Sequence, residues 1–208
     1  MMQAAKKIVL NVGGNSRHIA LPEHFADFDQ LLLDIDASRS PDLVCDARNL
    51  FSLEPGQFDA VYCSHTLEHF YRHDVQSVLK GILHVLKPGG FAHIRVPDLH
   101  QIFKAVLEDE IDLEGALYEA PVGTVSPLDT IYGYSKIIQA SGNDYFAHKT
   151  GFSPLTLQRA LVDAGFQRVY ISEGFYEVGS YAIKGEPMPW VPALLDLQMQ
   201  FGIDTLIS

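Results

Sequence analysis

Residues 58–70, FDAVYCSHTLEHF, decide how the rest of the chain is interpreted. The first seven residues are rich in β-branched and aromatic side chains and predict a buried strand over 58–64. The next five, from His65 to His69, match the H-x-x-E-H pattern of one class of zinc peptidases. Because the pattern follows the strand directly, we expect His65 at a strand-to-helix bend and not within a helix. A zinc peptidase is kept as an alternative, and no metal ligand is assigned.

Short apolar runs alternate with segments of helical periodicity on both sides of this stretch. Further strands are predicted at 6–12, 29–36, 42–46, 91–97, 167–174 and 177–185. A helix from about residue 73 is expected to stop at Pro88-Gly89-Gly90, and a later one over 153–166 has Ser153 as its N-cap and Gly165 as its stop. This alternation predicts an α/β protein with a mostly parallel sheet, whose last two strands are antiparallel neighbours.

The segment at about 99–152 interrupts this alternation. Asp98 is expected to cap a helix over 99–109, residues 117–127 form a loop or an edge hairpin, and 127–141 carry another helix. We therefore predict one domain, 1–208, with an insertion or lid at about 99–152. A tail at about 187–208 contains the only Trp and either packs on the body or contacts a second copy in a homodimer.

Composition narrows the class of partner. The formal net charge of -11 argues against nucleic acid, since phosphate binding needs clustered Lys and Arg. No stretch is long enough to cross a bilayer and no signal peptide is recognised, so a cytoplasmic location without membrane contact is expected. Cys45 and Cys63 lie in strand-like surroundings and are expected to be buried reduced thiols. An acidic enzyme acting on a small molecule is the simplest expectation.

Residues suited to a nucleoside follow four of the predicted strands. In open α/β sheets, ligands bind outside the C-terminal ends of the strands. Glycines there let the backbone approach a ligand, and carboxylates can take both hydroxyls of a ribose. The glycine stretch GGNSRH is not the G-x-G-x-x-G fingerprint, and little room remains after it for a full helix. The residues at these ends are Gly13, Gly14, Asp34, Asp36, Asp46, Ser64 and His65.

The order IVLNVGG, LLLDID, PDLVCDARNL, FDAVYCSHTLEHF and LKPGGFAHIRVPD resembles the class I S-adenosylmethionine-dependent methyltransferases, in particular the methyltransferase type 11-like group. The resemblance covers residues 6–98, with a degraded glycine motif, and the final helix and strand pair match the closing elements of that fold. It implies a Rossmann-like three-layer sandwich and S-adenosyl-L-methionine as cofactor. By position it implies the methionine moiety at Gly13 and Gly14; the ribose at Asp34, or Asp36; the adenine edge at Asp46 and Ala47; and the sulfonium near Ser64 and His65.

The acceptor side is expected in the part that the family pattern does not fix. Residues 132–152, YGYSKIIQASGNDYFAHKTGF, are dense in groups that can orient or deprotonate a substrate. His148 is the candidate base, with Tyr134 and His65 as further candidate catalytic residues. The same residues could instead cap and pack a loop.

Three alternatives accompany a methyltransferase that acts on a small-molecule or saccharide-like acceptor. The degraded glycine motif also suits a non-catalytic binding or assembly module of the same fold. The H-x-x-E-H pattern leaves the zinc peptidase. A nicotinamide dehydrogenase shares the fold class but would need the three-glycine fingerprint that this chain lacks.

Overall fold

A seven-stranded sheet forms the centre of the molecule, in the order β3-β2-β1-β4-β5-β9-β8. The computed structural model describes residues 6–121 and 123–196. The strands of this sheet are β1 (Lys7–Val12), β2 (Phe28–Asp34), β3 (Leu43–Val44), β4 (Phe58–Ser64), β5 (Leu86–Pro97), β8 (Arg168–Glu173) and β9 (Glu177–Ile183). The strands predicted from the apolar runs are thereby confirmed.

The strand pairing follows the predicted pattern. Strands β3, β2, β1, β4 and β5 pair in parallel, whereas β9 is antiparallel to both of its neighbours, β5 and β8. Val12 at the end of β1 lies opposite Leu33 of β2 on one side and Cys63 of β4 on the other. Strand order therefore reverses between β1 and β4, which is where ligands bind in sheets of this kind.

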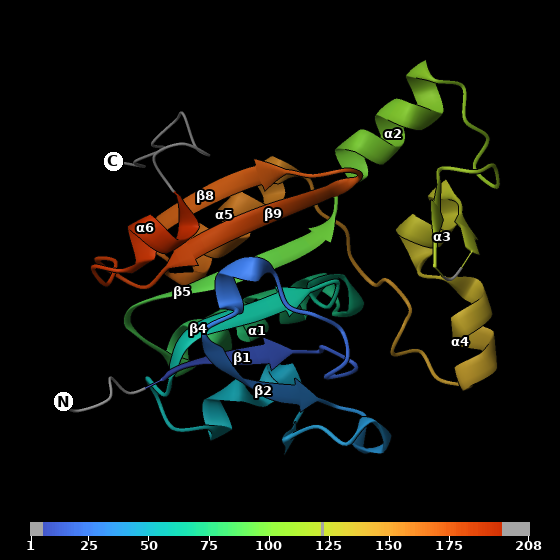
Figure 1. The fold of residues 1–208 in the computed structure, drawn as a ribbon. Helices are drawn as coiled ribbons and strands as arrows, with labels where there is room; N and C mark the ends of the chain where they lie inside the picture. Colours follow the sequence, from blue (N-terminus) through green and yellow to red (C-terminus); the bar gives the residue numbers. More distant parts are fainter. Residues whose placement is uncertain (1–5, 122, 197–208) are drawn as a thin grey trace.

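Helices cover the two faces of the sheet unequally. The helices α1 (Arg72–Val85) and α5 (Pro154–Ala164) lie together on one face, where they bury the larger apolar core (Figure 1). On the other face, the 3-10 turn η1 (Glu23–Phe25) and the short helix α6 (Val191–Leu195) cover a smaller aromatic core. The third layer of the sandwich is thus built from short segments, in keeping with the little room that the sequence leaves after β1.

The boundary between α1 and β5 corrects one prediction. The helix was expected to continue to Pro88, but it ends at Val85, and Leu86 is already extended and pairs with Phe58 of β4. Proline disfavours helical geometry in the residue before it, and Gly89 has a φ of +77° that begins a change of direction. The chain therefore enters the sheet within the LKPGG stretch and not after it.

The segment between β5 and α5 stands beyond the C-terminal ends of the central strands (Figure 1). It contains α2 (Leu99–Glu108), the hairpin β6 (Tyr118–Ala120) and β7 (Gly123–Val125), α3 (Pro127–Tyr132) and α4 (Ser135–Ser141). The cap on α2 is confirmed, since the Asp98 carboxylate accepts a hydrogen bond from His100 N at 2.9 Å. The hairpin forms a separate two-stranded sheet and not an edge of the main one.

The single helix expected over 127–141 is two helices, broken at Gly133. Its φ is +92°, and a Cβ there would lie 2.2 Å from the carbonyl oxygen of Phe146. The division of the chain into one domain with an insertion stays a prediction.

The two thiols and the tail complete the description. Both cysteines are free and Cys63 is buried as expected, but Cys45 is only partly buried, because it follows a two-residue strand at the sheet edge. Val191 and Leu195 of α6 pack on the sheet, whereas residues 197–208, to which the homodimer prediction also refers, lie outside the described residues. Within residues 6–121 and 123–196, no helix has the length and apolarity needed to cross a membrane.

Candidate functional site

A cleft of about 680 Å³ lies at the C-terminal ends of β1, β2 and β4, where strand order reverses. Small-molecule sites typically have volumes of roughly 300–1,000 Å³. Every residue predicted to bind the cofactor lines this one cleft: Gly13, Gly14, Asp34, Asp46, Ala47, Ser64 and His65. What each of them binds stays a prediction.

The glycine turn after β1 is fixed by the protein's own packing. Gly13 has a φ of +70° and donates a backbone hydrogen bond to Leu33 O at 2.8 Å. A Cβ at Gly13 would lie 2.5 Å from the Thr66 side chain, and one at Gly14 would lie 2.1 Å from the Asn11 amide. Both positions therefore exclude a side chain even without a ligand, and the turn holds bare backbone at the cleft wall.

Asp34 ends β2 with its carboxylate nearly buried at 9% exposure. One oxygen accepts a hydrogen bond from Asn15 N at 3.1 Å and the other accepts one from Asp36 N at 2.9 Å. Each carboxylate oxygen retains a second lone pair for a ligand hydroxyl. Asp36 also lines the cleft, but its carboxylate accepts from Ser38 N and caps the 3-10 turn η2 (Ala37–Arg39), and these hydrogen bonds lower its pKa. Asp34 is thus the better placed of the two.

Asp46 forms the next part of the wall and starts the 3-10 segment η3 (Ala47–Ser52). Its carboxylate accepts from Arg48 N at 2.9 Å and from the Arg48 guanidinium at 2.6 Å. The hydrogen bonds from Arg48 lower the pKa of Asp46 below its ordinary value. A charged, fixed acceptor of this kind suits an exocyclic amine.

The turn after β4 is strained at a non-glycine residue. His65 has a φ of +49°, in the left-handed region, and its N–H donates to Arg95 O at 2.9 Å. The Thr66 hydroxyl donates to Val12 O at 3.2 Å, which ties this turn to the end of β1. Strained backbone held by its surroundings clusters at functional sites.

Two carboxylates flank the His65 ring. Its Nδ1 lies 3.4 Å from Glu68 Oε1 and its Nε2 lies 3.4 Å from Glu177 Oε2. Partial burial lowers the pKa of His65, but the two carboxylates outweigh this effect and raise it to about 9. Burial likewise raises the pKa of Glu177, whereas His65 and Arg95 lower it to about 2. The two carboxylates therefore favour the protonated form of His65 at neutral pH.

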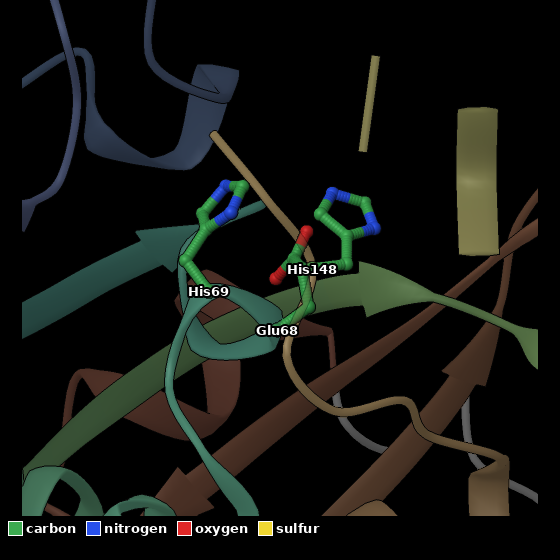
Figure 2. Close-up of side chains that lie close together, drawn as sticks. All are labelled: Glu68, His69 and His148. Carbon is green, nitrogen blue, oxygen red and sulfur yellow. The ribbon is translucent and has the colours of Figure 1, made fainter. Parts of the chain in front are cut away.

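A second cluster lies beside this turn, in the 3-10 turn η4 (Leu67–His69) and the loop before α5 (Figure 2). Glu68 is 1% exposed, and the imidazole rings of His69 and His148 are 4.9 Å apart. Backbone contacts bring the two segments together: Lys149 N donates to Glu68 O at 2.8 Å, and His69 Nδ1 lies 3.2 Å from Ala147 O. His148 thus reaches the strand-end turn although it lies far from it in the sequence.

The predicted catalytic residues do not all reach the cleft. His65 lines it, whereas His148 lies behind His69, and Tyr134 is the N-cap residue of α4 with the Lys136 ammonium 5.8 Å from its ring centre. Neither His148 nor Tyr134 belongs to the lining. The acceptor-side segment contributes other residues to the lining, namely Asp144, Tyr145, Phe146 and Lys149.

The zinc-peptidase alternative is wrong. Its helix would have to run through residues 65–69, but β4 ends at Ser64, η4 is three residues long, and α1 begins only at Arg72. The neighbouring His73 side chain is 79% exposed and stacks on Tyr71, away from the cluster.

Thr66, Glu68 and Glu177 are the residues that sequence reasoning missed. Glu68 stands inside the H-x-x-E-H pattern, but the pattern alone does not show that its carboxylate lies beside the His65 ring. Glu177 begins β9 and meets His65 only because β9 pairs with β5, so no local pattern signals it.

Comparison with known proteins agrees with this fold and site. Residues 12–94 match the family model described as a methyltransferase domain. The ubiquinone biosynthesis O-methyltransferase of Ralstonia nicotianae is 35% identical over 112 residues, which are 54% of this chain but only 42% of that protein. A SAM-dependent methyltransferase of Archaeoglobus fulgidus superposes with a TM-score of 0.55 at 17% identity, over 86% of this chain and 87% of that one. One from Methanosarcina mazei gives 0.54 at 14% identity, over 88% and 94%.

The fold and the cleft define an α/β protein of the Rossmann-like methyltransferase type. Residues 12–94 match a methyltransferase domain, and the fold is that of solved S-adenosylmethionine-dependent methyltransferases, for which S-adenosylmethionine is the cofactor. The dehydrogenase alternative fails, because the sheet ends in an antiparallel β9 between β5 and β8 and lacks the dinucleotide strand order.

Proposed function

We propose that this chain transfers a methyl group from S-adenosylmethionine to a small-molecule or saccharide-like acceptor. The observation that carries the proposal is the cleft at the strand-order reversal, which the glycine turn, Asp34, Asp46 and the strained turn at His65 all line. The match of residues 12–94 to the methyltransferase domain supports the same assignment.

The donor groups of the cleft suit the cofactor. Asp34 offers two oxygens to the ribose hydroxyls, Asp46 offers an acceptor to the adenine amine, and the turn at Gly13 and Gly14 offers bare backbone to the methionine moiety. When bound, the cofactor supplies a methyl group that its positive sulfur has already activated. The remaining requirement is alignment, which can lower a barrier by as much as ~7–11 kcal/mol.

The chain's own residues then have to orient an acceptor. His65 lines the cleft and is held between Glu68 and Glu177, with one ring nitrogen toward each carboxylate. Tyr145 and Lys149 line the opposite wall, where Lys149 pairs with Asp144 at 3.1 Å. The catalytic roles predicted for His65, His148 and Tyr134 remain part of the proposal.

The name of the matched Ralstonia protein makes an oxygen acceptor the first to test. The match covers less than half of that protein, so the acceptor itself is not transferred from it.

Calorimetry with the product S-adenosylhomocysteine tests the proposal. We expect one binding event per chain with a dissociation constant at or below the micromolar range, and no heat from NAD⁺ as a matched nucleoside control. Absence of heat at millimolar S-adenosylhomocysteine would contradict the proposal.

A second candidate, a non-catalytic module of the same fold, is favoured by one observation. The glycine turn is explained by Thr66 and Asn11, and both Asp34 and Asp46 already accept backbone hydrogen bonds, so none of these features requires a ligand. The same titration separates the two candidates, because the module predicts no binding that an Asp34 variant could abolish.

A further inference from the structure

We propose that Glu68, His69 and His148 form a binding site for a divalent transition-metal ion at the rim of the cofactor cleft. One carboxylate oxygen and two imidazole nitrogens, one atom from each residue, lie within 4.8 Å of one another. Figure 2 shows the three side chains converging, with the carboxylate of Glu68 directed toward the space between the two rings. The proposal departs from the sequence-based expectation of no metal.

Glu68 is the strongest single reason. Its side chain is 1% exposed, and neither carboxylate oxygen has a hydrogen-bond partner among the described residues. The contact with His65 Nδ1, at 3.4 Å, is an ion pair without hydrogen-bond geometry. Buried charges in proteins are normally paired or coordinate a metal. A cation between the rings would give these two oxygens a second charge partner besides His65.

His148 is prepared to act as a ligand. Its Nδ1 lies 2.7 Å from Thr130 O, so this nitrogen carries the proton and donates to the carbonyl. Nε2 is left with its lone pair. Metal-binding histidines commonly donate their other ring N–H to a carbonyl or carboxylate, which fixes the tautomer and the ring orientation.

His69 has a carbonyl oxygen beside each ring nitrogen. Nδ1 lies 3.2 Å from Ala147 O and Nε2 lies 3.1 Å from His65 O. A neutral ring can donate through only one nitrogen and directs a lone pair at the other carbonyl. A metal bound at that second nitrogen would use this lone pair, and the hydrogen bond from the other nitrogen would orient the ring.

The ligand set indicates which ions fit. Two imidazoles and one carboxylate are the protein ligands of catalytic zinc sites and of non-haem iron sites, whereas Mg²⁺ and Ca²⁺ prefer oxygen ligands. Three protein ligands leave at least one coordination position open. Because His69 also lines the cofactor cleft, the proposed metal site adjoins the cleft, and a ligand in the cleft is the group that we expect at the open position. A hydroxyl of a methyl acceptor could occupy it, a role that rests on the proposed function.

Zinc titration of chelator-treated protein that carries no polyhistidine tag tests the site. We expect one Zn²⁺ per chain by calorimetry, and a Co²⁺ derivative with the visible absorption of a four- or five-coordinate ion. Glu68→Gln and His148→Gln should each weaken Zn²⁺ binding by at least 10-fold. His73→Ala, which removes an exposed histidine outside the cluster, should leave it unchanged.

Three outcomes would overturn the proposal: no Zn²⁺ heat at 100 µM, Zn²⁺ binding that His73→Ala abolishes, or a Zn²⁺ affinity that both cluster variants retain. Circular dichroism of each variant identifies misfolding, and His148→Gln keeps an amide N–H for Thr130 if Glu68→Gln does not fold. S-adenosylhomocysteine titrated into the metal-free protein separates this proposal from the methyltransferase one, because the cofactor cleft does not need the ion to bind that product.

Discussion

Replacing Asp34 by alanine tests the cofactor cleft at one side chain. The carboxylate accepts hydrogen bonds from Asn15 N at 3.1 Å and Asp36 N at 2.9 Å, and its free lone pairs face the cleft. Hydrogen bonds to a charged group contribute ~1.5–3 kcal/mol each. Loss of two such bonds to a ribose should cost about 3–6 kcal/mol, or roughly 150- to 25,000-fold in the dissociation constant of S-adenosylhomocysteine. Loss of the two backbone contacts, which are of the same charged kind, should lower the free energy of unfolding by about 3–6 kcal/mol.

Calorimetry and thermal unfolding, measured on the same samples, separate these two effects. Asp34→Asn keeps one acceptor oxygen and should bind S-adenosylhomocysteine with intermediate affinity. Asp36→Ala is the matched control, because it removes a carboxylate two residues away whose main contact is with Ser38. The reasoning is refuted if Asp34→Ala binds as the wild type does, or if Asp36→Ala loses more affinity than Asp34→Ala.

Three further predictions concern stability, the glycine turn and the thiols. His93 is buried, and burial lowers its pKa from 6.5 to about 3. Between these pH values the unfolded chain binds a proton that the folded chain does not, so the free energy of unfolding decreases as the pH falls. In urea unfolding, His93→Phe should therefore raise the free energy of unfolding by about 2 kcal/mol at pH 5, and this proton-linked gain should be absent at pH 7.5. Gly14→Ala should weaken S-adenosylhomocysteine binding, and adding Asn11→Ala should recover it, because the new methyl group collides with the Asn11 amide. Cys45 lines the cleft, so it should react slowly with a thiol reagent at pH 8, and bound S-adenosylhomocysteine should protect it. Burial raises the pKa of Cys63 to about 12, so Cys63 should react only after denaturation.

Each of these has a clear contrary result. An equal effect of His93→Phe at both pH values would mean that packing and not protonation sets its contribution. If the Gly14→Ala, Asn11→Ala double variant does not recover affinity, the new methyl group at residue 14 collides with the ligand and not with the Asn11 amide. If S-adenosylhomocysteine protects both thiols equally, or protects neither, Cys45 does not lie at the ligand site.

Local sequence patterns were sufficient for most of the fold. The runs that form β1, β2, β4 and β5 are apolar because both faces of these strands are covered, and Ser153 and Gly165 delimit α5 through a capping box and a left-handed cap. Local patterns failed where a distant contact decided the outcome. The break at Gly133 is imposed by the Phe146 carbonyl, and the early end of α1 reflects the pairing of Leu86 with β4.

The candidate site divides in the same way. Gly13, Asp34 and Asp46 follow strands and could be placed from the end of each run, since parallel strands end at one edge of the sheet. Glu177 and His148 could not be placed, because the sequence does not say that β9 pairs with β5 or that the loop before α5 folds back on Glu68. The H-x-x-E-H pattern is typical of a metal site on a helix, whereas the metal site that we propose combines two of its residues with a histidine from another segment.

The structure of the protein with S-adenosylhomocysteine bound is the most direct test of the central claim. We predict the ribose hydroxyls on the Asp34 carboxylate, the adenine against Asp46 and Ala47, and the sulfur beside the turn at Ser64 and His65. An empty cleft at millimolar ligand, or a nucleoside bound away from Asp34, would contradict the assignment of this cleft to the cofactor.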